Sequence, residues 1–329
     1  MTIKNVLAIR QSGIGDILFT LPAINVIKSN YPDCKITYLT KKRFAVILKG
    51  FSAVDEVIAI DSDIFHSKNI GLAIKYSKEL LSRLKAGEFD LVVDFHGQTK
   101  TALFAWLTGT KERWGIIKSN CSKPFYRHKL EVSRDLHRID LNLKLLSLAG
   151  LNCQNITNSF ILPDEELQRG LKLFNQWGLS TEKPTIFIQP FTNYEYKNWP
   201  LEKFFELAKY WDNQGIQILF GGGPGDQAKL EQIADHFPVA AGQAGLLTTG
   251  ALMQLSTLII GGDTGMLHLA VALGKRVIML MNTINQTMFY PYGHPEWVIT
   301  PENTGSLADV DLSKVIEAID GFLRENCHD

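Results

Sequence analysis

The residues best suited to bind a ligand in this sequence are Asp263, Thr264 and Gly265. They follow an apolar, β-branched run at 257–260 and precede a segment of helical composition at 266–273. This order predicts a buried strand that ends at two glycines, and a helix that Asp263 or Thr264 caps. The first amides of a helix are unpaired and carry partial positive charge, and a glycine there lets a ligand approach the backbone. The stretch is consistent with a phosphate site, and equally with an ordinary capped helix in an α/β sheet.

Three further side chains could complete a site for a phosphate and a sugar. Lys197 lies between a predicted strand and a predicted helix at the same sheet edge, where its ammonium could neutralise a phosphate or simply face solvent. His268 comes one turn into the helix, where a packed histidine is the alternative. Asp226 ends the glycine-rich loop 221–226, and it could accept hydrogen bonds from ribose hydroxyls or cap its own helix.

Asp16 is a candidate general base. It ends a glycine-rich loop that starts at Arg10 and follows a predicted first strand at 6–9. Gly13 and Gly15 let a ligand approach its carboxylate, although an aspartate in this position is also a common helix cap. The loop lacks the third glycine of a dinucleotide fingerprint and the Lys-Ser/Thr of a P-loop, which argues against a dehydrogenase and a P-loop NTPase.

Strands and helices alternate along most of the chain, which predicts an α/β fold of doubly wound parallel sheets. The predicted strands are 6–9, 35–40, 54–60, 90–95, 113–117, 185–189, 216–220, 257–260 and 277–280; the predicted helices are 17–30, 75–85, 99–107, 138–150, 165–177, 201–214, 227–235, 266–273 and 312–325. The pattern loosens around 151–163, which predicts domains at 1–160 and 161–311. A final helical segment, 312–329, could pack back towards the first domain. Such sheets bind ligands at the carboxyl ends of their strands, so a cleft between the domains is expected.

Bulk composition limits the function classes. A length of 329 residues with 45% hydrophobic and 21% charged residues is typical of a globular protein of about two domains. The formal net charge is zero, so overall charge gives no reason to expect a nucleic-acid or membrane partner. Cys34, Cys121, Cys153 and Cys327 form no C-x-x-C pair, which argues against a disulfide framework or a structural zinc site and for a reducing compartment. No apolar run is long enough to span a membrane and the amino-terminal segment reads as a strand, so a cytoplasmic protein without a metal site is expected.

The segment from Lys111 to Arg138 is strongly basic. It carries eight lysines and arginines against three acidic residues, with aromatic residues between them. The segment could be a solvated loop, or it could hold an anionic partner. Arg127 and Lys129 lie at its centre.

Five ordered segments carry a family resemblance. They are Arg10-x5-Asp16 followed by Ile-Leu-Phe-Thr-Leu-Pro-Ala23; Asp94-Phe-His-Gly97 with Lys100; Lys197-Asn-Trp-Pro200; Gly223-Pro-Gly-Asp226; and Asp263-Thr-Gly-x-x-His268-x-Ala-x-Ala272. Together they closely resemble the motifs of glycosyltransferase family 9, the bacterial lipopolysaccharide heptosyltransferases. The resemblance extends over nearly the whole chain. It departs from the family at Phe191, where glycine is usual, at Asp226, where glutamate is usual, and at His96, where glutamine is common.

The resemblance implies a GT-B architecture, in which two Rossmann-like domains face each other across a cleft. The first domain would bind the acceptor and the second the nucleotide sugar. Asp16 would be the general base, and the donor-binding residues would be Lys197, Asp226, Asp263, Thr264, Gly265 and His268. The acceptor-binding residues would be Gly15, His96, Lys100, Arg127 and Lys129.

The implied reaction is the inverting transfer of a heptose from ADP-heptose to the lipid A–Kdo inner core. The nucleotide-sugar donor and an anionic lipopolysaccharide-core acceptor would be the partners, without nucleic acid and without a required cofactor or metal. A monomer, with or without peripheral contact to the inner membrane surface, is the expected state. Transfer of another sugar such as an N-acetylhexosamine, a non-catalytic core-binding role and a GT-B epimerase are the alternatives.

Overall fold

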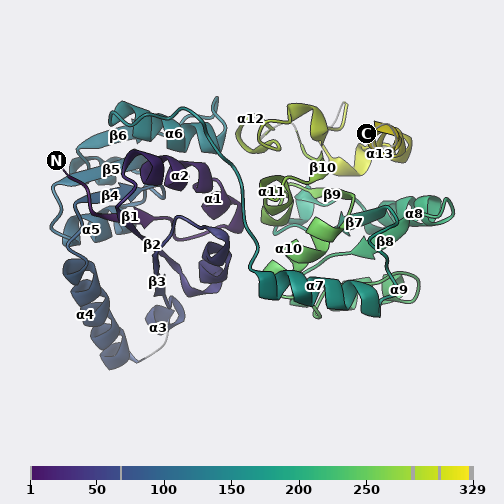
Figure 1. The fold of residues 1–329 in the computed structure, drawn as a ribbon, viewed down its shortest axis with the longest axis horizontal. Helices are drawn as coiled ribbons and strands as arrows, with labels where there is room; N and C mark the ends of the chain where they lie inside the picture. The colour runs from purple at the N-terminus through teal and green to yellow at the C-terminus, as the bar shows by residue number, and fades with distance from the viewer. Residues whose placement is uncertain (1, 67–68, 283–285, 303–304, 326–329) are drawn as a thin grey trace. The chain divides into compact units, whose positions relative to one another are not determined.

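The computed structural model describes residues 2–66, 69–282, 286–302 and 305–325. The chain divides into two compact units, Met1–Ser159 and Phe160–Asp329, where the sequence predicts a boundary after residue 160. Each unit has a parallel sheet with helices, so the predicted α/β fold class is confirmed (Figure 1). Cys327 and the last residues of the predicted segment 312–329 lie outside the described residues.

The first unit contains a six-stranded parallel sheet in the order β3-β2-β1-β4-β5-β6 (Figure 1, purple to teal). Its strands are β1 Asn5–Ile9, β2 Lys35–Lys41, β3 Glu56–Ile60, β4 Leu91–Asp94, β5 Glu112–Ile117 and β6 His128–Glu131; its helices are α1 Ile14–Leu18, α2 Leu21–Asn30, α3 Asp63–His66, α4 Ile70–Ala86, α5 Thr99–Leu107 and α6 Arg138–Leu148. The strand order changes direction between β1 and β4. In parallel sheets this switch point is where loops diverge and leave room for a ligand.

Side chains of alternate strand residues build the core of this unit. Leu7 and Ile9 of β1 point to one face, where they pack with Leu80 and Leu84 of α4 and with Ala102 of α5. Successive strand residues point to opposite faces, and Val6 and Ala8 are fully buried as well, as expected for a sheet covered on both faces.

The second unit contains a five-stranded parallel sheet in the order β11-β10-β9-β7-β8 (Figure 1, teal to yellow). Its strands are β7 Thr185–Gln189, β8 Gln217–Phe220, β9 Leu258–Gly262, β10 Arg276–Leu280 and β11 Val298–Ile299; its helices are α7 Asp164–Gln176, α8 Leu201–Asp212, α9 Glu231–Ala234, α10 Leu246–Leu255, α11 Gly265–Ala272, α12 Gln286–Phe289 and α13 Leu312–Glu325. Here the order changes direction between β7 and β9, which places a second switch point at their carboxyl ends.

Both faces of this second sheet are buried. Ile186 and Ile188 of β7 pack in a cluster with residues of α8 and α13, whereas Phe187 between them packs in another cluster with residues of α7, α10 and α11. Val315 and Ile319 of α13 are fully buried in the first of these clusters. The apolar face of the carboxyl-terminal helix therefore contributes to the core of the second unit.

The structure corrects several element boundaries. The predicted helix 17–30 is broken into α1 and α2, with Phe19 and Thr20 between them, so Asp16 lies within a short helix and not in a loop. The predicted helix 227–235 is a 3-10 segment, Pro224–Leu230, followed by the single turn α9. Gly261 and Gly262 do not end the strand at a turn, because β9 includes both.

Helix α10 was not predicted, and its packing against α7 gives a test of the fold. A Cβ atom added at Gly170 of α7 would lie 2.6 Å from the Cβ of Ala251 in α10, whereas nothing lies within 4 Å of a Cβ added at Gly321 of α13. We expect Gly170→Ala to lower the free energy of unfolding by about 1–2 kcal/mol, because overpacking outweighs the gain in helix propensity. Gly321→Ala should raise it by roughly 0.5–1 kcal/mol. Urea unfolding of both variants measures the difference, and equal shifts would contradict the close helix contact.

Among the residues described, no helix is long and apolar enough to cross a bilayer. Cys34, Cys121 and Cys153 are free thiols.

Candidate functional site

The switch point of the second unit contains a three-residue charge network. Lys197 Nζ lies 2.6 Å from Asp263 Oδ2, and His268 Nε2 lies 3.2 Å from Asp263 Oδ1. Only 15%, 12% and 5% of the side chains of Lys197, Asp263 and His268 are exposed. Three residues that the sequence proposes for donor binding therefore form one connected group, from the loops that follow β7 and β9 and from α11.

Asp263 is held as a carboxylate. Burial opposes its ionisation, but the hydrogen bond and charge of His268, together with the Lys197 ammonium, outweigh that effect and lower the pKa of Asp263. Its two oxygens thereby fix the position of the Lys197 ammonium and the ring of His268. The lysine is positioned before any ligand arrives.

The start of α11 offers two backbone donors. Thr264 is the N-cap, and its Oγ1 accepts a hydrogen bond from the Met266 amide at 3.0 Å. Of the two capping residues that the sequence offers, Asp263 and Thr264, the structure uses Thr264. The amides of Leu267 and His268 donate to the Thr264 carbonyl. Within the described parts of the chain, the Thr264 and Gly265 amides have no hydrogen-bond partner. Two N–H groups at the positive end of a helix can bind an anion.

The two glycines of β9 allow a close approach between loops. A Cβ atom at Gly261 would lie 2.3 Å from the Gln189 carbonyl oxygen, and one at Gly262 would lie 2.8 Å from the Lys197 carbonyl oxygen. A side chain at Gly262 would push the loop that carries Lys197 away from β9, and one at Gly261 would clash with the end of β7, from which that loop starts. The glycines are thus needed to hold Lys197 against Asp263.

Asp226 caps its own helical segment. Its Oδ2 accepts from the Gly223 amide at 2.9 Å, which is one of the two roles that the sequence leaves open. Its role towards a ribose stays a prediction.

The switch point of the first unit contains the predicted base. Asp16, in the first turn of α1, forms an ion pair with Arg10, whose Nη1 donates to the Phe95 carbonyl at 2.7 Å. The Arg10 side chain is 8% exposed and that of Asp16 is 34% exposed. Gly13 has a φ of 84°, and a Cβ there would lie 2.7 Å from Asp16 Oδ2. Gly13 therefore leaves room for the carboxylate, and Arg10 orients it while one side stays accessible.

Two cations that were not singled out as site residues surround this carboxylate. Lys118, directly after β5, and Arg138, at the start of α6, line a narrow pocket together with Arg10 and Asp16. Burial and the adjacent Arg10 guanidinium lower the pKa of Lys118 to about 8. Both cations belong to the basic segment Lys111–Arg138, but only the sheet topology shows that they lie next to Asp16.

The Asp94-Phe-His-Gly97 segment forms the loop between β4 and α5. Asp94 is fully buried and accepts from Tyr126 Oη at 2.5 Å and from the amides of His96 and Gly97 at 2.8 and 3.0 Å. Burial raises the pKa of Asp94. The hydrogen bonds that its carboxyl group accepts hold the loop in place. For His96, burial and the charges of Arg10 and Lys118 lower the pKa to about 4. His96 is therefore a neutral imidazole at pH 7, beside the cations of the Asp16 pocket.

The remaining residues predicted to bind the acceptor have different surroundings. Gly15 lies in α1 next to Asp16. The Lys100 ammonium lies 5.1 Å from the ring centroid of Phe65. Arg127 precedes β6, at the amino end of that strand, where it pairs with Glu112; Lys129 is exposed on β6, the edge strand. Arg127 and Lys129 are thus not among the residues that line the Asp16 pocket.

Aromatic residues of the basic segment have structural roles. Trp114 and Tyr126 are 5% and 4% exposed, so they are part of the core and do not form a surface for bases or sugars. No cluster of three or more potential metal ligands occurs in the ranges that the structure describes.

Two parallel-sheet α/β units, each with polar residues at the carboxyl edge of its sheet, define the GT-B class of fold. Comparison with known proteins agrees. The family profile of glycosyltransferase family 9 (heptosyltransferase) matches residues 78–318. Lipopolysaccharide heptosyltransferase 1 of Salmonella typhimurium is 24% identical over 324 residues, which cover 95% of this chain and 99% of the relative.

Solved structures show the same fold. A glycosyl transferase family 9 protein from Veillonella parvula superposes with a TM-score of 0.88 at 21% identity, covering 99% of this chain and 98% of that chain. The E. coli heptosyltransferase WaaC with ADP gives a TM-score of 0.81 at 20% identity, covering 97% and 99%. The chain belongs to glycosyltransferase family 9, and it is a glycosyltransferase enzyme.

Proposed function

We propose that this enzyme transfers a heptose, with inversion, from ADP-heptose to the lipid A–Kdo core of lipopolysaccharide. The carrying observation is the start of α11, where two unpaired amides lie beside the Lys197–Asp263–His268 network. The relatives support the choice of sugar and nucleotide, because they include lipopolysaccharide heptosyltransferases and a heptosyltransferase solved with ADP.

In the proposed donor site, the diphosphate accepts hydrogen bonds from the Thr264 and Gly265 amides and from the Lys197 ammonium. As the bond between the anomeric carbon and the diphosphate breaks, negative charge grows on the leaving phosphate. Fixed amides and a fixed ammonium stabilise this charge without reorganising, which lowers the barrier. Asp226 would hold the ribose, and His268 would keep Asp263 and hence Lys197 in position.

In the proposed acceptor site, Asp16 takes the proton of the acceptor hydroxyl while its oxygen bonds to the anomeric carbon. The attack and the departure of ADP occur on opposite faces, so the configuration inverts. Arg10 orients the carboxylate, and Lys118 and Arg138 provide positive charge for the phosphates and carboxylates of the acceptor. Gly15 gives the acceptor access to the carboxylate, and His96 lines the same region as a neutral donor or acceptor. Lys100, Arg127 and Lys129 would contribute more distant positive charge. The proposed enzyme acts as a monomer at the inner membrane surface in the cytoplasm.

The test is to incubate the purified protein with Kdo-containing lipid A and ADP-heptose, and to follow the mass of the acceptor and the release of ADP. A gain of one heptosyl residue is expected. If the protein transferred sugar only from another nucleotide sugar, that sugar and not heptose would be its donor substrate. Absence of transfer from every donor, while ADP still raises the melting temperature, would favour a non-catalytic core-binding protein.

The charge of Lys118 gives the proposed acceptor site a pH dependence. With its pKa lowered to about 8, Lys118 is a cation at pH 7 and becomes neutral as the pH rises to 9. Loss of one cation that contacts a phosphate should raise the acceptor KM by about tenfold between pH 7 and pH 9. Lys118→Arg keeps its charge over this range, so its acceptor KM should stay level. Parallel profiles for the two proteins would show that Lys118 does not contact the acceptor.

A further inference from the structure

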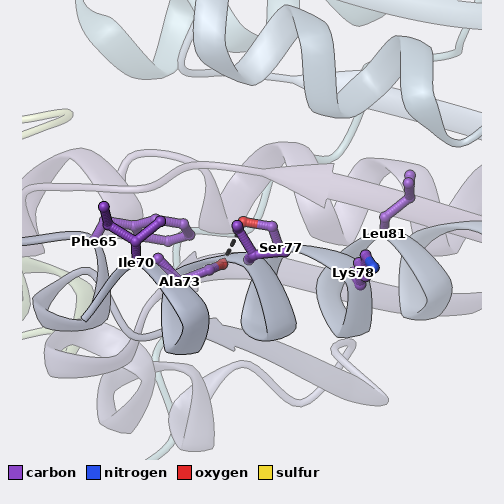
Figure 2. Close-up of a pocket in the computed structure, with 7 residues that line it drawn as sticks. Phe65, Ile70, Ala73, Ser77, Lys78 and Leu81 are labelled. Carbon is purple, nitrogen blue, oxygen red and sulfur yellow. Dashed lines mark hydrogen bonds between the residues drawn. The ribbon is translucent and has the colours of Figure 1, made fainter.

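The first unit carries an exposed apolar groove that the proposed reaction does not use. The groove has a volume of about 400 Å³, and its lining residues are Phe65 of α3 and Ile70, Ala73, Ile74, Ser77, Lys78 and Leu81 of α4. Figure 2 shows Phe65 and Ile70 at one end, and Lys78 and Leu81 towards the other.

The apolar residues of helix α4 are buried only towards its carboxyl end. Leu80 and Leu84 are buried in the core of the first unit. Ile70, Ile74 and Leu81 share one side of the helix, because residues four and seven apart recur on the same side. Ile70 is 74% exposed and Ile74 is 53% exposed, and Phe65 beside them is 37% exposed.

The polar atoms of the groove do not interrupt this face. The Ser77 hydroxyl donates to the Ala73 carbonyl at 2.8 Å, so its donor is turned back onto its own helix (Figure 2). Several large aliphatic side chains in one exposed row are unusual for a surface that meets only water.

Positive charge surrounds the apolar row. Lys78 lines the groove, and Lys85 lies two turns after Lys78 on the same side of α4. The Lys100 ammonium of α5 lies 5.1 Å from the Phe65 ring centroid. In the described parts of the chain, none of these three lysines has an ion-pair partner. An apolar row with unpaired lysines beside it is complementary to a surface whose outer layer is anionic and whose interior is apolar.

We propose that the α3–α4 groove docks on a bilayer of anionic phospholipids. Phe65, Ile70 and Ile74 insert between the headgroups, and Lys78 and Lys85 pair with lipid phosphates. The choice of a lipid surface over an acidic protein rests on the proposed function, whose acceptor is anchored in a membrane by acyl chains.

The experiment is co-sedimentation of the full-length protein with vesicles of phosphatidylglycerol and phosphatidylethanolamine, compared with vesicles of phosphatidylcholine. No donor or acceptor is present, so the result does not depend on sugar transfer. Wild-type protein should pellet with the anionic vesicles and be released by high salt. Ile74→Gln should weaken binding by about tenfold or more, and Lys78→Gln by roughly fivefold.

Matched controls are Ile161→Gln, at an isoleucine that is 59% exposed outside the groove, and Lys172→Gln on α7. Both should bind as wild type, and all four variants should keep wild-type melting temperatures and wild-type activity on an acceptor without acyl chains.

Equal pelleting with both kinds of vesicle, or unchanged binding of Ile74→Gln, would overturn the proposal. A concentration-dependent dimer that Ile74→Gln abolishes, without vesicle binding, would assign the groove to a second copy of the chain. Vesicle binding without any sugar transfer would leave the docking surface standing and refute only the proposed reaction.

Discussion

Asp16→Asn is expected to lower kcat for sugar transfer by about 100- to 10,000-fold, because the amide cannot take the proton of the acceptor hydroxyl. The substitution keeps the shape of the side chain, and Gly13 still leaves room for it. Donor binding should be unaffected, since the residues proposed to hold the diphosphate belong to the second unit. Initial rates of ADP release and titration of ADP by calorimetry separate the two effects.

Asp135→Asn is the matched control for this substitution, because Asp135 is an exposed aspartate in the same basic segment. Its kcat should equal that of the wild type. A kcat for Asp16→Asn within threefold of wild type would remove Asp16 as the base. A melting temperature well below wild type would point instead to loss of the ion pair with Arg10, and Asp16→Glu, which keeps the charge, would then restore stability.

Lys197→Met is expected to lower kcat/KM by about 10- to 100-fold and to raise the Kd for ADP by roughly tenfold. Hydrogen bonds to charged groups typically contribute this much, and the proposed charge on the departing diphosphate makes the loss greater in the transition state than in the ground state. Methionine keeps the length of the side chain, so the packing of the loop against Gly262 should persist. Steady-state kinetics with varied donor, together with ADP titration, measures both quantities.

Two further substitutions sharpen this test. Lys172→Met removes an exposed lysine of the same unit and should change neither kcat/KM nor the Kd for ADP. Asp263→Asn removes the carboxylate that fixes Lys197 at 2.6 Å, so it should weaken ADP binding through the position of the lysine. If Lys197→Met bound ADP as tightly as wild type, the ammonium would have no part in holding the diphosphate.

Local sequence signals were enough to predict the main elements of the fold. The limits of β7 and α5 agree with their predicted ranges, and the unit formed by β9, α11 and β10 was predicted to within about two residues. Thr264 caps α11 as one of two predicted alternatives, and Gly274 ends the helix with a φ of 73°. Such elements are set by β-branched runs, caps and helix-ending glycines, which act within a few residues.

Features that depend on distant contacts could not be predicted in the same way. Helix α10 was missed because its residues are almost all apolar or small, so they show no helical period. Gly261 and Gly262 were assigned to a turn, whereas their role is to let the loops after β7 approach β9. The break before α2 also involves a tertiary contact, since Thr20, which precedes α2, is hydrogen-bonded at 2.8 Å to Tyr38 of β2.

In the candidate site, too, local motifs were predicted from the sequence but contacts between distant residues were not. Asp16, Lys197, Asp263 and His268 are proposed as site residues from their motifs, but the ion pair between Lys197 and Asp263 joins residues from two separate loops and could not be predicted from them. Lys118 and Arg138 come next to Asp16 only because β5 lies beside β4 and because α6 begins near this sheet edge. Sequence distance gives no indication of either contact.

In the proposed reaction, the start of α11 holds the diphosphate of the donor. Amide resonances of Thr264 and Gly265, assigned in isotopically labelled protein and followed during titration with ADP, test it most directly. We expect these two resonances to show the largest shifts in the protein, and we expect Lys197→Met to need more ADP for the same shifts. Saturable binding of ADP that leaves both resonances in place would contradict it.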